Sequence, residues 1–139
     1  MTEAHDSTRS IQVDQFLPHP PAKVWRALTD PELLERWWAA GNIKPEAGHR
    51  FHLDMESWGQ VPCQVLEVEP EERLTFAFGD TWTLDWRLVV EGSGIRLPLE
   101  HSGFDLDDPR DRHAFEQMGT GWRGEVLPEL ARTLDAVNV

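Results

Sequence analysis

The residues of this chain best suited to binding chemistry are its indole side chains and one histidine. The sequence contains seven Trp and six Phe but no Tyr, so any hydrogen bond from a large aromatic side chain must come from an indole N–H. Ligand pockets are mostly apolar, with few polar groups. The side chains that could line one are Trp37, Trp38, Phe76, Trp82, Trp86, Met118 and Trp122. They could equally fill an ordinary core, since each large aromatic buries about 150 to 250 Å².

His101 is the polar residue that could orient a ligand. It follows Leu97 and Leu99 at a period of two, which places the three side chains on one face of a predicted strand. One interpretation makes His101 a polar anchor for a bound molecule. The other makes it a buried histidine, hydrogen-bonded to the backbone or to an N-terminal indole, because buried polar groups normally find partners.

The other reactive side chains do not assemble into a known catalytic pattern. Cys63 shares the phase of Val61 and Val65, and a buried cysteine usually behaves as a small hydrophobe. His49 and His52 lie three apart on a strand and point to opposite faces, which does not suit a zinc site. The sequence has no nucleophile elbow, phosphate loop or triad. We therefore predict no catalytic residue, no metal site and no cofactor.

Two short helices near the start of the chain must position the first indoles. The stretch from Val24 to Trp38 is divided at Asp30-Pro31, where Asp30 suits an N-cap and Pro31 suits the first helical turn. A strand is predicted before them, over residues 11 to 17. Residues 1–9 are polar and aperiodic, which predicts a flexible N-terminal arm, with residues 10–139 forming a single domain.

The middle of the chain is predicted to be an antiparallel meander. From about residue 50 to residue 104 apolar residues alternate with polar ones, and turn residues separate the runs. The clearest strand runs from Trp82 to Val90, with alternate residues on the core face. The strand after it contains Pro98, which cannot donate to a ladder, so this strand should lie at an edge or be bulged there.

A long C-terminal helix completes the predicted fold. It begins at Asp107-Asp108-Pro109, and Gly124 and Pro128 predict a bend or frayed turn within it. These elements bury their apolar faces together only if a curved sheet wraps the last helix. The sequence thus predicts an α+β helix-grip fold, with a curved antiparallel sheet of about six strands around the helix and two short helices after the first strand.

Several motifs are similar to those of one known family. They are Val24-Trp25-Arg26-Ala27-Leu28-Thr29-Asp30-Pro31, Trp37-Trp38, Gly48 with Phe51, Val65-Leu66-Glu67-Val68, His101-Ser102-Gly103-Phe104, and Gly121-Trp122 with Leu127, Leu130 and Leu134. Through them, residues from about 11 to 137 resemble the activator of heat-shock-protein-90 ATPase homologue family of the START-related SRPBCC superfamily. The resemblance implies that an apolar ligand binds between sheet and helix.

Charge and composition limit the classes of partner. A net charge of −12 disfavours nucleic acid and anionic membrane surfaces, and no apolar run reaches the roughly 20 residues of a membrane span. We expect a cytoplasmic protein, monomeric or homodimeric, that encloses a small apolar or aromatic molecule. The alternatives are a protein-interaction module, such as a chaperone accessory or stress-linked factor, and a cyclase-like or hydrolase-like enzyme that uses His101 as acid or base.

Overall fold

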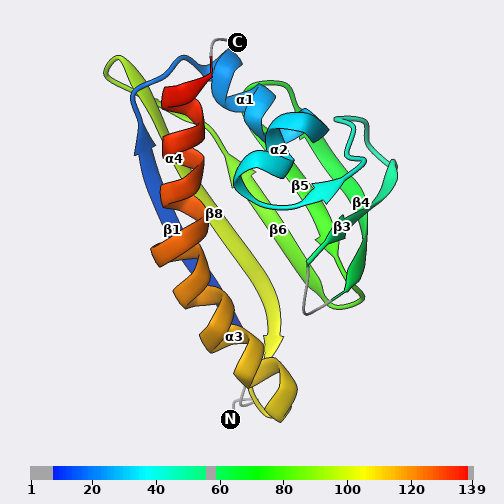
Figure 1. The fold of residues 1–139 in the computed structure, drawn as a ribbon. Coiled ribbons are helices and arrows are strands. Elements are labelled where there is room, and N and C mark those ends of the chain that lie inside the picture. The colour runs from blue at the N-terminus through cyan, green and yellow to red at the C-terminus, as the bar shows by residue number, and fades with distance from the viewer. Residues whose placement is uncertain (1–7, 56–58, 138–139) are drawn as a thin grey trace, which may run out of the picture.

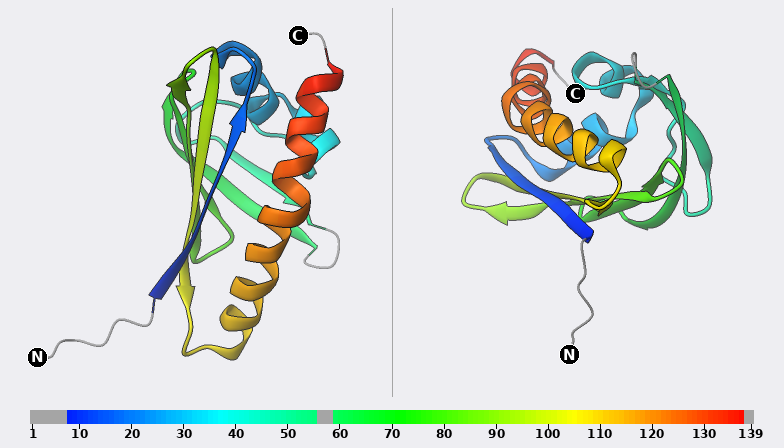
Figure 2. Two further views of the ribbon diagram at one scale, coloured as in Figure 1. Left: turned by 90° about the vertical axis from the view of Figure 1, so that its left-hand side faces the viewer. Right: turned by 90° about the horizontal axis from the view of Figure 1, so that it is seen from below.

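One antiparallel sheet forms the framework of the molecule. The computed structural model describes residues 8–55 and 59–137, and within them the strand order is β1-β8-β6-β5-β4-β3-β2, with β7 paired to β8. The strands are β1 (Thr8–Leu17), β2 (Ala40–Gly41), β3 (Arg50–Asp54), β4 (Gln60–Glu69), β5 (Arg73–Phe78), β6 (Trp82–Arg87), β7 (Val89–Glu91) and β8 (Gly94–Asp105). The sheet curves around the C-terminal helix, which lies on its concave side (Figure 2). This arrangement confirms the predicted helix-grip fold.

The two short helices follow β1, as predicted. Helix α1 (Pro21–Thr29) ends at Asp30, whose side chain caps α2 (Pro31–Trp37) by accepting a hydrogen bond of 3.0 Å from the backbone N–H of Glu32. Both helices begin with a proline. Backbone N–H groups in the first turn of a helix have no acceptor within the helix, so proline loses no hydrogen bond by lacking one there. They pack against the C-terminal end of the last helix (Figure 1).

The C-terminal helix is continuous through three segments. Helix α3 (Pro109–Gly121) passes into a π-helical turn, η2 (Trp122–Val126), and then into α4 (Leu127–Ala136). The N–H of Leu127 donates to the carbonyl of Trp122, five residues earlier, and Pro128 follows at once. A proline in a regular helix would lack a donor and clash with the carbonyl four residues before it, and the wider turn accommodates both effects. The distortion predicted near Gly124 and Pro128 is therefore a π turn, without fraying.

The strand predicted from Trp82 to Val90 is divided in two. Strand β6 ends at Arg87 and β7 begins at Val89, while Val90 is 71% exposed instead of facing the core. Strand β8 lies between β1 and β6, so its proline is not at a sheet edge, contrary to one form of the prediction. The pairing of β6 and β7 with β8 is interrupted near Pro98, which has no backbone N–H donor. The N–H of Leu88 donates instead to the carbonyl of Glu72 at 2.9 Å.

The N-terminal boundary also differs slightly from the expectation. Strand β1 begins at Thr8, which pairs with Asp105, so ordered structure starts within the stretch expected to be an arm. Residues 1–7 of that stretch lie outside the described residues. The sequence predicted a sheet of about six strands. The described sheet has two more, β2 and β7, which are only two and three residues long.

Candidate functional site

A pocket of about 550 Å³ opens between the C-terminal helix and the sheet. One wall comes from the end of α2 with β2 and β3, the other from α3 and η2, and β5 and β8 contribute one residue each. Its lining side chains include Glu35, Trp38, Asp54, Met55, Phe78, His101, Gln117, Met118, Trp122 and Glu125. The π turn therefore forms part of the pocket wall. Single π-helical turns are frequently found at functional sites.

His101 is held by the helix that faces it. Its side chain is 0% exposed, and its Nδ1 atom accepts a hydrogen bond of 3.1 Å from the indole Nε1–H of Trp122. The rings of Phe78 and Phe104 lie against the imidazole, at centroid distances of 5.7 and 4.6 Å. One sequence interpretation gave His101 an indole partner from the N-terminal pair, whereas the indole in fact comes from the C-terminal helix.

The hydrogen bond from Trp122 determines where the imidazole of His101 carries its proton. Burial lowers the pKa of His101 to about 3, so the ring is neutral near pH 7. Because Nδ1 accepts, the single proton of the neutral ring lies on Nε2. Among the described residues, Nε2 has no hydrogen-bond partner. The pocket is thus lined by a histidine with a buried, unsatisfied N–H donor.

The candidate site residues singled out from the sequence divide between the pocket and the core. Those on the pocket lining are Trp38, His101, Met118 and Trp122. The others are not part of the lining: Trp37, Phe76, Trp82 and Trp86. Trp37, Phe76 and Trp86 are buried in the core, and Trp82 packs against Phe104 at a centroid distance of 5.1 Å. The structure therefore places four of these eight residues on the pocket lining and the other four outside it.

The core indoles support the lining ones. Trp38 and Trp122 lie 5.1 Å apart between ring centroids, with their planes inclined by 51°. Trp86 meets Trp122 edge-on at 5.6 Å and Trp37 edge-on at 5.8 Å. Trp37 is fixed in turn, because its indole N–H donates to the carbonyl of Ala27 at 2.9 Å. Edge-to-face contacts of this kind are favourable beyond their buried area, so they stabilise the packing behind the pocket wall.

Several lining residues were not identified from the sequence. Phe78 shares the phase of Phe76 in β5, so the alternation of that strand could have pointed to it. Glu125 lies three residues after Trp122 in η2, a spacing that places helical side chains on one face. Glu35 lies in the last turn of α2, and Trp38 follows the end of that helix. Helical glutamates are usually solvated, which is why this spacing carried no signal.

Cys63, His49 and His52 are not among the residues that line the pocket. Burial raises the pKa of the Cys63 thiol to about 12, which keeps it protonated and unreactive. The Nε2 atom of His49 lies 2.9 Å from the backbone carbonyl oxygen of Asn42. Among residues 8–55 and 59–137, no three His, Cys, Asp or Glu side chains are grouped to hold a metal ion.

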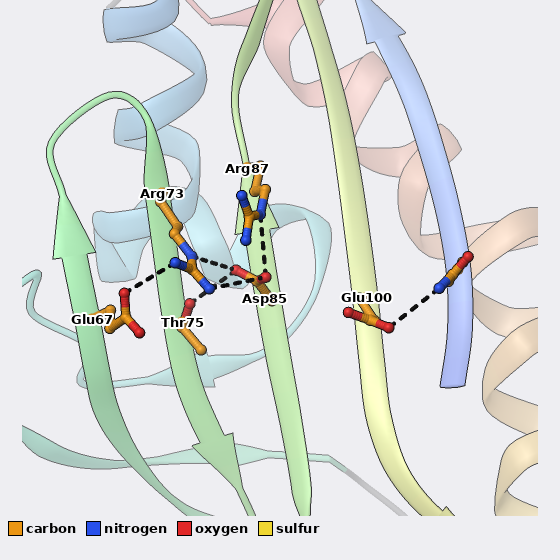
Figure 3. Close-up of polar contacts among 7 residues, drawn as sticks. Glu67, Arg73, Thr75, Asp85, Arg87 and Glu100 are labelled. Atoms are coloured by element: carbon orange, nitrogen blue, oxygen red, sulfur yellow. Dashed lines mark hydrogen bonds and ion pairs between the residues drawn. The ribbon is translucent and has the colours of Figure 1, made fainter. Parts of the chain in front are cut away.

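A polar network covers the opposite face of the sheet (Figure 3). Asp85 accepts hydrogen bonds from Arg73 at 3.1 Å, Thr75 at 2.9 Å and Arg87 at 3.3 Å, and Arg73 also reaches Glu67 at 3.1 Å. Burial alone would raise the pKa of Asp85, but the bonds from Arg73 and Thr75 and the nearby guanidinium charges lower it overall. The network is internally paired and stabilises the sheet.

Comparisons with known proteins identify the family of this chain. The sequence model of the activator of Hsp90 ATPase homolog 1-like proteins matches residues 18–135. The chain belongs to this family. No curated protein sequence matches it. No helix within the described residues is long and apolar enough to cross a membrane.

Three solved structures share the fold of nearly all of this chain. MLL2253 from Mesorhizobium loti is 32% identical, with a TM-score of 0.84 over 94% of this chain and 100% of that one. BH1534 from Bacillus halodurans is 28% identical, with a TM-score of 0.82 over 92% and 99%. CalU16 from Micromonospora echinospora is 26% identical, with a TM-score of 0.71 over 93% and 78%. In each case the similarity covers more than nine-tenths of this chain, so nearly the whole chain shares its fold with these structures.

Proposed function

We propose that the protein binds a small, largely aromatic molecule in the pocket between its sheet and its C-terminal helix. The observation that carries the proposal is the buried Nε2–H of His101, which has no partner among the described residues and belongs to a pocket-lining side chain. A buried donor without an acceptor is unfavourable by about 1 to 3 kcal/mol, and a ligand carbonyl or ether oxygen would remove that penalty. The pocket volume of about 550 Å³ lies within the usual range for small-molecule sites.

The same geometry favours binding over acid or base catalysis by His101. A general base needs an available lone pair, yet Nδ1 is occupied by the indole of Trp122 and Nε2 bears the proton. A neutral imidazole is also a very weak acid. His101 therefore suits the role of a fixed hydrogen-bond donor, which orients a ligand without exchanging a proton with it.

Two measurements test the proposal. Native mass spectrometry of gently purified protein should show a mass excess that disappears on denaturation. Titration with an aromatic ketone, 4-propylacetophenone, should shift the Nε2–H signal of His101 in proton–nitrogen NMR spectra. His101→Phe should weaken ketone binding at least about tenfold, whereas His101→Gln, which keeps both a donor and an acceptor, should weaken it less. An unshifted His101 signal throughout the titration would refute the proposal.

A further inference from the structure

The two walls of the pocket present the same pair of side chains. Trp38 and Glu35 lie three residues apart at the end of α2, and Trp122 and Glu125 lie three residues apart in η2. All four line the pocket, and the two indole rings are 5.1 Å apart. Each wall thus includes one tryptophan and one glutamate.

The charge of the lining is one-sided. Asp54 adds a third carboxylate, and no lysine or arginine is among the described residues that line the pocket. Glu35 and Glu125 are both exposed, so they lie at the solvent side, while His101 is fully buried. The exposed carboxylates therefore lie toward the mouth of the pocket, and the lining also includes the buried side chain of His101.

We propose that the ligand is an amphipathic organic cation, whose ammonium group lies between the indoles of Trp38 and Trp122 and the carboxylates of Glu35 and Glu125. Its neutral oxygen acceptor meets the Nε2–H of His101. This inference rests on the proposed function and adds the charge of the ligand to it. Cations are attracted to the faces of indole rings and to carboxylates, so both groups of the mouth act in the same direction.

The arrangement also selects against organic acids. A ligand carboxylate would meet the like charges of Glu35 and Glu125, with no basic side chain among the described residues of the lining, and its approach would be repelled. Because the glutamates of the mouth are exposed, their contribution should weaken as salt screens it. The contact of the ketone with His101 is buried and should respond little to salt.

Three ketones that share one core separate these effects. They are 4-(2-aminoethyl)acetophenone, 4-propylacetophenone and 3-(4-acetylphenyl)propanoic acid, which are cationic, neutral and anionic at pH 7. Isothermal titration at low salt should give an affinity for the amine about tenfold above that for the neutral ketone, with the acid weakest. Raising the salt concentration should narrow these differences and leave the neutral ketone almost unaffected.

Charge-neutral variants identify the groups responsible. The double substitution Glu35→Gln and Glu125→Gln should reduce the preference for the amine over the neutral ketone to about twofold or less. Glu116→Gln removes the same charge from an exposed position of α3 outside the lining, and should keep the preference. A preference that survives the double substitution would overturn the assignment of these carboxylates.

The outcomes distinguish this inference from the function on which it rests. Equal affinity for the amine and the neutral ketone, with His101 still shifted in the NMR spectra, would overturn the cationic ligand and preserve the binding function. Tighter binding of the acid would overturn it as well. Failure of all three ketones to bind would refute the proposed function, and the inference with it.

Discussion

The indole N–H of Trp122 donates to Nδ1 of His101 across 3.1 Å, which joins the C-terminal helix to strand β8 at the pocket. Trp122 is also the first residue of the π turn, and its carbonyl accepts the N–H of Leu127. The backbone distortion associated with Pro128 therefore occurs at the residue that sets the tautomer of His101. One short segment of helix both shapes the pocket wall and aims its polar donor.

Trp122→Phe should release His101 from this constraint. The variant keeps an aromatic ring but removes the donor to Nδ1, so the neutral imidazole should populate both tautomers, which long-range proton–nitrogen NMR spectra distinguish. Loss of a buried hydrogen bond should lower the free energy of unfolding by about 1 to 3 kcal/mol in urea titrations. Trp37→Phe is the matched control, because it removes an indole bond to the carbonyl of Ala27 and should leave His101 unchanged. A single Nε2–H tautomer in the Trp122 variant would contradict the prediction.

Acidification should reveal the burial of His101. Its pKa is about 3 in the folded protein and near 6.5 in the unfolded chain, so between these values the unfolded state binds a proton that the folded state does not. This contribution to stability is present above pH 6.5 and is lost as the pH falls toward 3, at up to about 1.4 kcal/mol per pH unit. His101→Gln removes the titrating group.

Urea titrations from pH 7 to pH 4 check this effect. The variant should lose less stability than the native chain over this range, because the carboxylates that also titrate are common to both proteins. Parallel pH profiles for the two proteins would show that His101 is accessible to protons in the folded state.

The helical pair was predictable because its signals are local. Asp30 and Pro31 carry both the end of one helix and the cap of the next within two adjacent residues. The division of the predicted strand at Leu88 was not predictable in this way. It depends on Pro98, which lies on the neighbouring strand β8. The sequence shows that Pro98 lacks an N–H donor, but it does not show which residue would be opposite it.

The pocket was predictable only in part, for a similar reason. His101 and Trp122 have inward phases within their own elements, but their hydrogen bond depends on how the helix lies over the sheet. Trp86 belongs to the same inward-facing set, yet it lies behind Trp122 and does not reach the lining. Periodicity identifies the face of an element that is buried. It does not separate residues that fill a core from residues that border a cavity.

Asp85→Asn should weaken the sheet without changing the pocket. The neutral amide accepts less strongly from Arg73 and Thr75, so the free energy of unfolding should fall by about 1 to 2 kcal/mol at pH 7. The pKa of Asp85 is lowered in the folded protein, so its contribution is present at neutral pH and is lost on acidification. Glu100→Gln is a control on the same face, since its bond from Gln12 is exposed and worth little (Figure 3). Altered ketone affinity in the Asp85 variant would show that the two faces are coupled.

Gly121→Ala should stabilise the protein and weaken ligand binding. A Cβ at Gly121 or at Gly124 meets no atom within 4 Å, and alanine is favoured over glycine in helices by about 1 kcal/mol. Both alanine variants should therefore be more stable than the native protein in urea titrations, by about 0.5 to 1 kcal/mol. Only Gly121 lines the pocket, so only its methyl group enters the space that a ligand would occupy. Titration with 4-propylacetophenone should show weaker binding for Gly121→Ala and unchanged binding for Gly124→Ala, and equal affinities for the two variants would place the ketone away from the helix.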